Sequence, residues 1–222
     1  VGSGELDAGI TGRDLLVDSD AVAVEILALN FGSSTFRFAA LAGSNLSLSS
    51  LTGKRVATAY PVLLGKYLAE QKISAQVVRL DGAVETSVRL GVADAIADVV
   101  STGTTLRQAG LEIFGDPIFK SEAVLISRDN SKSLETLIRR LQGVIIARQY
   151  VLMDYDVSNE LVEAACKITP GIESPTVSPL HSSGWSAVRA MVLRKETNRV
   201  MDDLWNLGAR GILVTDIHAC RL

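Results

Sequence analysis

The chain has 222 residues, of which 47% are hydrophobic, 5% aromatic and 21% charged, and its formal net charge is −3. This composition excludes a disordered chain, and a core built from aliphatic rather than aromatic residues favours α/β architecture over an aromatic-rich β-sandwich. The balanced charge excludes the basic surface that nucleic acids require, and no apolar run is long enough to span a membrane.

Short apolar strands alternate with helices through the first part of the chain. Strands are predicted, in chain order, at residues 6–13, 31–41, 54–59, 75–80, 93–100 and 122–127. Helices are predicted at residues 61–72, where Pro61 suits the first turn, at residues 83–93, where Val84, Val88 and Val92 recur at helical spacing, and from about Leu106. Alternating β and α elements of this kind predict a mostly parallel sheet covered by helices.

The last third of the chain follows a different order. After a helix at 133–147, strands are predicted at 150–157, 169–180, 185–192 and 211–222, and helices at 159–168, capped by Ser158, and at 195–209. Three prolines in residues 169–180 indicate an edge strand. The order βαββαβ predicts a ferredoxin-like domain, and we therefore place the domains at 1–147 and 148–222.

Residues 94–106 carry the clearest chemical signal. A buried strand brings Asp98 to its C-terminal end, and the small residues of the following loop surround Gly103 and lead into a helix. Open α/β sheets bind ligands at this end, where hydroxyl and N–H groups bind phosphate and an acid binds ribose hydroxyls or hydrated Mg²⁺. This arrangement suits a phosphorylated sugar. The alternative is that Ser and Thr only cap the helix while Asp98 orders the loop.

The segment LDGAVETSVRLGVADAIADVVSTGTTLRQAGL resembles the phosphoribosyl-pyrophosphate-binding region of ATP phosphoribosyltransferases. The similarity extends through GITGRDL, FGSSTFR, KRVATAYP, DYDV, TPGIESPTVSPL and WSAVRAMV, and so covers essentially the whole chain. It implies an α/β fold with two lobes like those of type II periplasmic binding proteins, the second at about residues 37–122, with crossings near 33–38 and 122–127. The C-terminal domain resembles the ACT-like regulatory domain of the long, hexameric, histidine-regulated form of the family.

The resemblance also implies a reaction, the first step of L-histidine biosynthesis. Adenine N1 of ATP attacks C1 of phosphoribosyl pyrophosphate, giving N1-(5-phospho-β-D-ribosyl)-ATP and diphosphate, with Mg²⁺ on the pyrophosphate and no protein metal ligand assigned. A good leaving group and an oxocarbenium-like carbon require positioning and electrostatics rather than a nucleophile or a general base. We therefore assign no certain catalytic residue and expect Asp98 and Glu85 to act by electrostatic positioning.

Motif matching implies two substrate subsites. Phosphoribosyl pyrophosphate is expected against Glu85, Asp98, Val99, Ser101, Thr102, Gly103, Thr104 and Thr105, and ATP or the product against Asp14, Leu15 and Tyr60. Thr104 stands where several relatives carry a basic residue, so this loop is expected to hold its phosphate with one charge fewer. The alternatives are a solvated helix face for Glu85 and core packing for Tyr60.

The family's C-terminal domain binds histidine as a feedback inhibitor. By resemblance, the allosteric site would comprise Asp156, Ile172, Ser174, Thr176, Met191 and Gly211, with the Asp156 carboxylate on the α-ammonium group. Without the resemblance, Asp156 reads as the neighbour of a helix cap, and ferredoxin-like domains often serve only as dimer or hexamer contacts.

Cysteine usage and the family comparison bear on compartment and partners. Cys166 and Cys220 are typical of reduced thiols in a cytoplasmic protein, and neither has metal-ligand spacing to a histidine. We expect a homo-oligomer, from dimer to hexamer, with ATP, phosphoribosyl pyrophosphate and L-histidine as ligands and neither nucleic acid nor membrane as partner. Because the chain opens at Val1 in mid-domain, we expect an N-terminal segment to precede it. The rival hypothesis is a non-catalytic solute-binding protein or ligand-sensing paralogue of the same lobe architecture.

Overall fold

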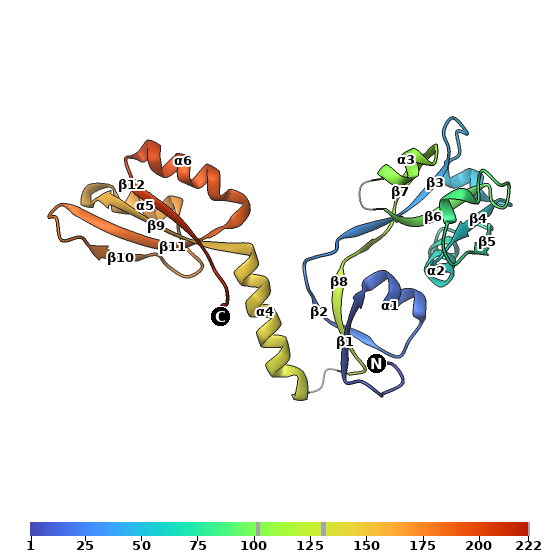
Figure 1. The fold of residues 1–222 in the computed structure, drawn as a ribbon, viewed down its shortest axis with the longest axis horizontal. Helices are drawn as coiled ribbons and strands as arrows, with labels where there is room; N and C mark the ends of the chain where they lie inside the picture. Colours follow the sequence, from blue (N-terminus) through green and yellow to red (C-terminus); the bar gives the residue numbers. More distant parts are fainter. Residues whose placement is uncertain (101–102, 130–131, 222) are drawn as a thin grey trace. The chain divides into compact units, whose positions relative to one another are not determined.

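The computed structural model describes residues 1–100, 103–129 and 132–221 and divides into two compact units, Val1–Leu134 and Glu135–Leu222 (Figure 1). The division assigns helix α4 (Glu135–Gln149) to the second unit, whereas the sequence analysis places the boundary after this helix, near residue 148.

The first unit contains two sheets. The smaller sheet has the order β1-β8-β2, with β1 (Ala8–Gly12), β8 (Ala123–Ser127) and β2 (Val24–Ala28), and helix α1 (Arg13–Ser19) follows β1. The larger sheet has the order β5-β4-β6-β3-β7, with β5 (Gln76–Arg79), β4 (Arg55–Thr58), β6 (Ala95–Val100), β3 (Ser34–Leu41) and β7 (Leu111–Ser121). Its helices are α2 (Pro61–Glu70) and α3 (Thr104–Gln108). The unit also contains the short 3₁₀ turns η1 (Leu48–Leu51), η2 (Val84–Thr86) and, after β8, η3 (Lys132–Leu134).

The chain passes between these two sheets twice, first between β2 and β3 and again at Glu122, which separates β7 from β8. The crossing segments are hydrogen-bonded to each other, because Ala123 donates to the Phe31 carbonyl at 2.9 Å and accepts from Leu29 at 2.9 Å. The small sheet with α1 therefore forms one lobe and residues 34–121 form the other, as Figure 1 shows. This confirms the predicted two-lobed architecture.

Both faces of the large sheet are covered. Phe36 and Phe38 of β3 pack with Leu64 of α2 on one face, while Ala39 and Ile96 belong to a second cluster on the other. Successive side chains of a strand point to opposite faces, so strands buried on both faces read as continuous apolar runs. This is why the apolar runs predicted β4 and β6 correctly.

The prediction of a mostly parallel sheet is wrong. Only β4 makes parallel pairs, with β5 and with β6, whereas β3 lies antiparallel to both β6 and β7, and all pairs of the small sheet are antiparallel. The reason is the pair of crossings, since the chain enters the second lobe on β3 and leaves it on β7 in the opposite direction. Strand β7 was not predicted, because Gly115 and Pro117 interrupt it in the pattern of a turn.

Two further local predictions need correction. The helix expected at residues 83–93 is only the single 3₁₀ turn η2, because Gly82, Ala83 and Gly91 all adopt positive φ and break helical geometry. Conversely, the strand predicted at residues 6–13 ends at Gly12, and helix α1, which was not predicted, begins at Arg13.

The second unit is a four-stranded antiparallel sheet with the order β10-β11-β9-β12, which confirms the ferredoxin-like prediction. After α4 its elements are β9 (Tyr150–Ser158), η4 (Asn159–Leu161), α5 (Val162–Ile168), β10 (Thr176–Pro179), β11 (Trp185–Leu193), η5 (Arg194–Glu196), α6 (Thr197–Leu207) and β12 (Arg210–Asp216). Strand β10 is at the edge, as predicted, but Ser158 makes no side-chain capping bond to the helix that follows it.

One face of this second sheet carries the core. Met153 and Tyr155 of β9 pack with Ala165 of α5 and Leu204 of α6. The alternate residues of β9, among them Asp156, point to the opposite face, which neither α5 nor α6 covers. The predicted regulatory aspartate therefore lies on the open face of the sheet.

Candidate functional site

Asp98 lies in β6, opposite Arg37 of β3 in the antiparallel register. Its Oδ1 accepts a hydrogen bond from the backbone N–H of Val99 at 2.7 Å. Burial raises the pKa of Asp98, the Val99 N–H lowers it in part, and the carboxylate of Glu85 raises it further. Glu85, in η2, is therefore within electrostatic reach of Asp98, and no basic side chain among the described residues forms an ion pair with either carboxylate.

The loop after β6 is described from Gly103 onward, so Ser101 and Thr102 of the predicted phosphate loop lie outside the described residues. Gly103 occupies the N-cap position of α3 at φ +71°, a left-handed conformation that favours glycine. Thr104 and Thr105 are the first residues of α3, which is five residues long. A helix therefore begins directly after Gly103.

Asp14, the second residue of α1, is only 6% exposed. Its backbone N–H donates to Ser121 Oγ at 3.1 Å, and its Oδ1 accepts from the backbone N–H of Leu15 at 2.9 Å. A Cβ on Gly12 would lie 2.2 Å from that Oδ1, so only glycine leaves room for the carboxylate. Leu15, by contrast, is 50% exposed.

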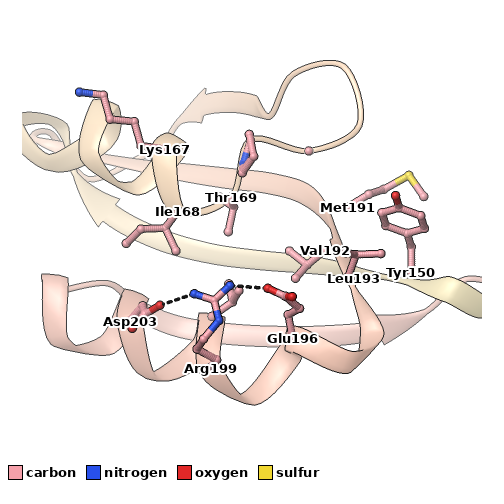
Figure 2. A pocket seen from close by; sticks show the side chains of 13 residues that line it. Tyr150, Lys167, Ile168, Thr169, Met191, Val192, Leu193, Glu196, Arg199 and Asp203 are labelled. Atoms are coloured by element: carbon pink, nitrogen blue, oxygen red, sulfur yellow. Dashed lines mark hydrogen bonds and ion pairs between the residues drawn. The ribbon is translucent and has the colours of Figure 1, made fainter.

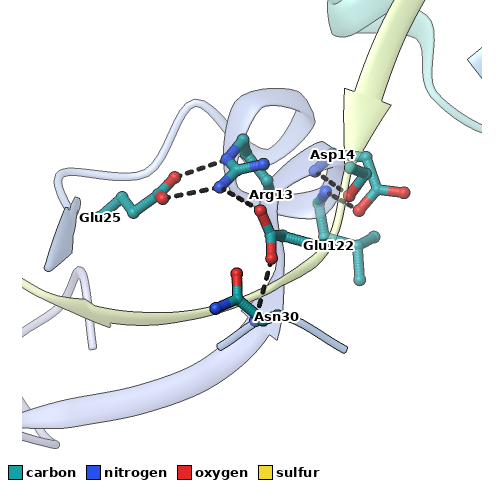
Figure 3. Close-up of polar contacts among 7 residues, drawn as sticks. Arg13, Asp14, Glu25, Asn30 and Glu122 are labelled. Atoms are coloured by element: carbon teal, nitrogen blue, oxygen red, sulfur yellow. Dashed lines mark hydrogen bonds and ion pairs between the residues drawn. The ribbon is translucent and has the colours of Figure 1, made fainter. Parts of the chain in front are cut away.

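An ion-pair network holds the start of α1 against the chain crossing, as Figure 3 shows. Arg13 donates to both carboxylate oxygens of Glu25, at 2.7 and 2.8 Å, and to Glu122 Oε1 at 3.1 Å. The other oxygen of Glu122 accepts from the backbone N–H of Asn30 at 3.0 Å. The guanidinium holds the pKa of Glu25 below its usual range. This network joins α1, β2 and both crossing segments, and it positions Asp14 at the junction of the lobes.

Tyr60 lies within electrostatic reach of carboxylates from both lobes. It follows β4 and precedes α2, and its ring meets that of Phe36 edge-on at 5.5 Å between centroids. Burial raises the pKa of Tyr60, and the carboxylates of Asp14, Asp98 and Asp18 raise it further. The ring thus packs on the core, as the core-packing alternative for Tyr60 predicts. The hydroxyl lies within electrostatic reach of carboxylates from both lobes.

A cavity of about 340 Å³ lies at the same junction. Its lining comes from α1, both crossing segments, the start of β3 and the ends of β6 and β7, and comprises Arg13, Ser33, Ser34, Thr35, Val100, Lys120, Ser121 and Glu122. The sequence analysis did not select Lys120 or the serines as site residues. The polar run before β3 was the available signal, but it was interpreted only as part of a strand.

In the second unit, Asp156 and Gly211 of the predicted histidine site lie together. A Cβ on Gly211 would be 3.4 Å from Asp156 Oδ2, and Gly211 has φ +58°. Met191 is not near them, because Asp156 pairs with Ala187 and Met191 lies four residues farther along β11, about 13 Å at 3.3 Å per residue.

The remaining predicted histidine residues precede or lie in the edge strand. Ile172 is 38% exposed, Ser174 makes only a long 3.5 Å bond to the Pro175 carbonyl, and Thr176 is exposed on β10. Because β11 separates β10 from β9, Thr176 is two strands away from Asp156. The six residues therefore share one region of the domain without forming one compact pocket in a single chain.

A cavity in this domain lies away from Asp156. A cavity of about 400 Å³, shown in Figure 2, runs between the end of α5, β11 and the start of α6. Arg199 lies across it between Glu196 and Asp203, with 3.0 Å to the latter. Of the six predicted histidine residues, only Met191 lines this cavity.

The described residues contain no group of three or more side chains that could hold a metal ion. No helix within them combines the length and the apolarity needed to cross a bilayer.

Comparison with known proteins agrees with the arrangement of both units. A family model described as "ATP phosphoribosyltransferase" matches residues 1–143, and one described as "HisG, C-terminal domain" matches residues 147–219. An ATP phosphoribosyltransferase of Pseudarthrobacter chlorophenolicus is 65% identical over 228 residues, and one of Streptomyces coelicolor is 59% identical over 229. Each alignment covers 100% of this chain and 80% of the relative.

A solved structure is also similar. The ATP phosphoribosyl transferase (HisG:HisZ) complex from Thermotoga maritima aligns with 25% identity and a TM-score of 0.54, covering 61% of this chain and 67% of that chain. The two family models match in order along the chain, and the relatives are similar over its full length. Both comparisons therefore indicate the same family. The chain belongs to the ATP phosphoribosyltransferase family, the pentosyltransferases that carry out the first step of histidine biosynthesis.

Proposed function

We propose that the junction of the two lobes binds both substrates of the family's reaction. Phosphoribosyl pyrophosphate would lie against Asp98, Glu85 and residues 101–105, and ATP against Asp14, Leu15 and Tyr60. The observation that carries this proposal is the surroundings of the Tyr60 hydroxyl, which lies within electrostatic reach of Asp14 from one lobe and Asp98 from the other. Residue groups that the sequence assigns to different substrates therefore both lie near enough to Tyr60 to raise its pKa.

Negative charge beside the sugar would stabilise the transition state of this reaction. As the C1–N1 bond forms and the C1–O bond to diphosphate breaks, the ribose carbon becomes cationic. A half-buried carboxylate without a basic partner stabilises such a charge more strongly than a solvated one, since the local dielectric is low. Asp98 would accept a ribose hydroxyl on Oδ2, because Oδ1 already binds the Val99 N–H. Glu85 would act beside it, and neither residue needs to move a proton.

The donors present also fit Mg²⁺ that arrives with the substrate. This ion prefers oxygen ligands and usually binds through substrate phosphates with one or two carboxylates, rather than through a complete protein cage. Asp98 and Glu85 offer those carboxylates. When bound, Mg²⁺ would neutralise charge on the leaving diphosphate.

Calorimetry tests the substrate assignment. Phosphoribosyl pyrophosphate with Mg²⁺ and ATP are each titrated into the chain, first alone and then in sequence. Both substrates are expected to bind, and Asp98→Asn should weaken only the binding of phosphoribosyl pyrophosphate. Failure of both substrates to bind would overturn the proposal and favour the solute-binding or ligand-sensing alternative.

We further propose that the C-terminal domain binds L-histidine through Asp156, Ile172, Ser174, Thr176, Met191 and Gly211 and inhibits the reaction. The lack of a side chain at Gly211 supports this, because a Cβ there would lie 3.4 Å from Asp156 Oδ2 and glycine leaves that space to an ammonium group. Because Met191 is about 13 Å away along β11, a compact site would need Met191 from a second copy. This agrees with the proposed homo-oligomer, from dimer to hexamer.

Histidine titration with Asp156→Ala tests the regulatory site. Asp154→Ala is the matched control, because Asp154 lies on the same open face two residues earlier and pairs with Arg189 at 2.6 Å. Histidine binding is expected to be lost in Asp156→Ala and retained in Asp154→Ala. Equal binding by the wild type and Asp156→Ala would contradict the assignment. A cytoplasmic location accompanies the proposed biosynthetic role.

A further inference from the structure

Helix α2 begins without a capping side chain of its own. Tyr60 occupies the N-cap position but makes no side-chain capping bond, and Pro61 at the first helical position has no N–H. The first free N–H groups of the helix are therefore those of Val62 and Leu63. Both donate to a single acceptor, Asp18 Oδ1, each at 2.9 Å.

This acceptor comes from the other lobe. Asp18 lies in α1, which follows β1 of the small sheet, whereas α2 follows β4 of the large sheet. Capping groups usually come from residues next to the helix start, but here 44 residues separate Asp18 from Val62. The bond is therefore a contact between lobes, and separation of the lobes would leave two helix-terminal N–H groups to water.

The carboxylate suits this position for two reasons. Negative charge at a helix N-terminus is favoured by the helix dipole, and hydrogen bonds to an ionised acceptor are about twice as strong as neutral ones. A second pair, Lys66 of α2 with Asp20 directly after α1 at 2.9 Å, joins side chains that are 51% and 75% exposed. Such an exposed pair contributes little, so Asp18 is the stronger of the two links.

The Asp18 contact also lies beside the proposed ATP subsite. Asp14 and Asp18 are four residues apart on α1 and so lie on the same face of that helix. Tyr60 is the residue directly before α2. The contact thus joins the helix that carries Asp14 to the helix whose start carries Tyr60.

We propose that Asp18 is a positioning residue that clamps α1 of one lobe to the start of α2 in the other, and so fixes Tyr60 relative to Asp14. It acts through these two residues and does not itself touch substrate. The inference rests on the proposed function only for its consequence, the binding of ATP, since the clamp is a contact within the chain. Loss of the clamp allows the lobes to separate and weakens ATP binding.

A distance measurement between the lobes tests the clamp without any substrate. Spin labels on Ile10→Cys of β1 and Glu70→Cys of α2 report the separation in a background where Cys166 and Cys220 are serine. Asp18→Ala is expected to broaden the distance distribution and shift it to longer values. Asp18→Asn keeps an oxygen that accepts both N–H groups, and it should preserve the distribution. Asp20→Ala, which removes only the exposed pair, is the matched control and should also preserve it.

Calorimetric titration of ATP tests the consequence. Asp18→Ala should bind about tenfold more weakly, the effect of removing charged hydrogen bonds, while Asp18→Asn should retain affinity within about threefold. A double-mutant cycle separates positioning from general destabilisation, because positioning predicts that Asp18→Ala adds little loss once Tyr60 is phenylalanine.

The outcomes distinguish the clamp from the substrate assignment. An unchanged distance distribution in Asp18→Ala overturns the clamp. Additive losses of ATP affinity from Asp18→Ala and Tyr60→Phe overturn the positioning role and leave Asp18 a structural cap. If the wild type does not bind ATP but Asp18→Ala separates the lobes, the ATP assignment fails while the clamp stands.

Discussion

Replacement of Asp98 by asparagine should separate the requirements of binding from those of folding. The amide oxygen can keep the 2.7 Å bond from the Val99 N–H, so local geometry is preserved. The second carboxylate oxygen becomes an NH₂ group, which cannot accept a ribose hydroxyl. One hydrogen bond to a charged acceptor is lost, which is worth about 2–3 kcal/mol. The dissociation constant for phosphoribosyl pyrophosphate should therefore rise about 30- to 150-fold.

Asp98→Asn should weaken substrate binding without lowering the free energy of unfolding at neutral pH. Burial and the neighbouring Glu85 raise the pKa of Asp98 above its ordinary value of 3.8, so the ionised form is less favourable in the folded chain than in the unfolded one. At neutral pH this lowers the free energy of unfolding of the wild type, and Asp98→Asn removes the penalty. The penalty is complete above the folded pKa and disappears as the pH falls through that value to below 3.8. The variant should therefore be at least as stable as the wild type at neutral pH and lose its advantage in acid.

Asp94→Asn is the matched control, because the surroundings of Asp94 lower the pKa of its carboxyl group whereas those of Asp98 raise it. It accepts from Arg55 Nη2 at 3.1 Å and from the Arg55 backbone N–H at 2.8 Å, and these bonds hold its pKa below the ordinary value. Asp94→Asn should lose stability and keep its affinity for the sugar phosphate. Denaturant unfolding at two pH values and calorimetric titration measure both quantities. If Asp98→Asn binds as tightly as the wild type, or unfolds more readily at neutral pH, the reasoning is refuted.

Two further predictions concern a glycine packed beside Asp14 and a buried hydrogen bond of Tyr155. Gly12→Ala should turn the Asp14 carboxylate away from its site, because the new Cβ would lie 2.2 Å from Oδ1, and titration should show ATP affinity at least about tenfold lower. Gly65→Ala in α2 is its control, since nothing lies within 4 Å of the added Cβ, and it should raise stability by about 0.5–1 kcal/mol without affecting ATP. Tyr155→Phe should lower the free energy of unfolding by about 1 kcal/mol, because it removes the buried 2.7 Å bond to Thr169 Oγ1. An unchanged denaturation midpoint in Tyr155→Phe would contradict that value.

Periodicity was sufficient where local pattern and burial agree. The run 54–59, the helix from Pro61 and the strand at 93–100 were predicted correctly, because strands buried on both faces and an amphipathic helix leave strong local signals. The βαββαβ order also predicted the C-terminal fold class, and the prolines of residues 169–180 predicted the edge position of β10. Alternation within β9 carried the further information that Asp156 faces away from the core.

Prediction failed where partners distant in sequence decide the structure. Strand β7 contains a glycine and a proline that indicate a turn, yet it pairs with β3 along most of its length. The spacing of Val84, Val88 and Val92 suggested a helix, but positive φ at Ala83 and its glycine neighbours prevents one. In both cases the local pattern was real, and backbone geometry imposed by the fold overrode it.

The sequence by itself determined the family, the two-lobed α/β class, the ferredoxin-like domain and the identity of the residues selected for each ligand. Only the tertiary structure decided that Tyr60 lies within electrostatic reach of Asp14 and Asp98, that Asp18 caps a helix of the other lobe, and that Met191 lies far from Asp156 within one chain. The physical reason is that motifs and periodicity record interactions between residues close in sequence. The approach of two lobes depends on hydrogen bonds and charges between segments that no local spacing connects.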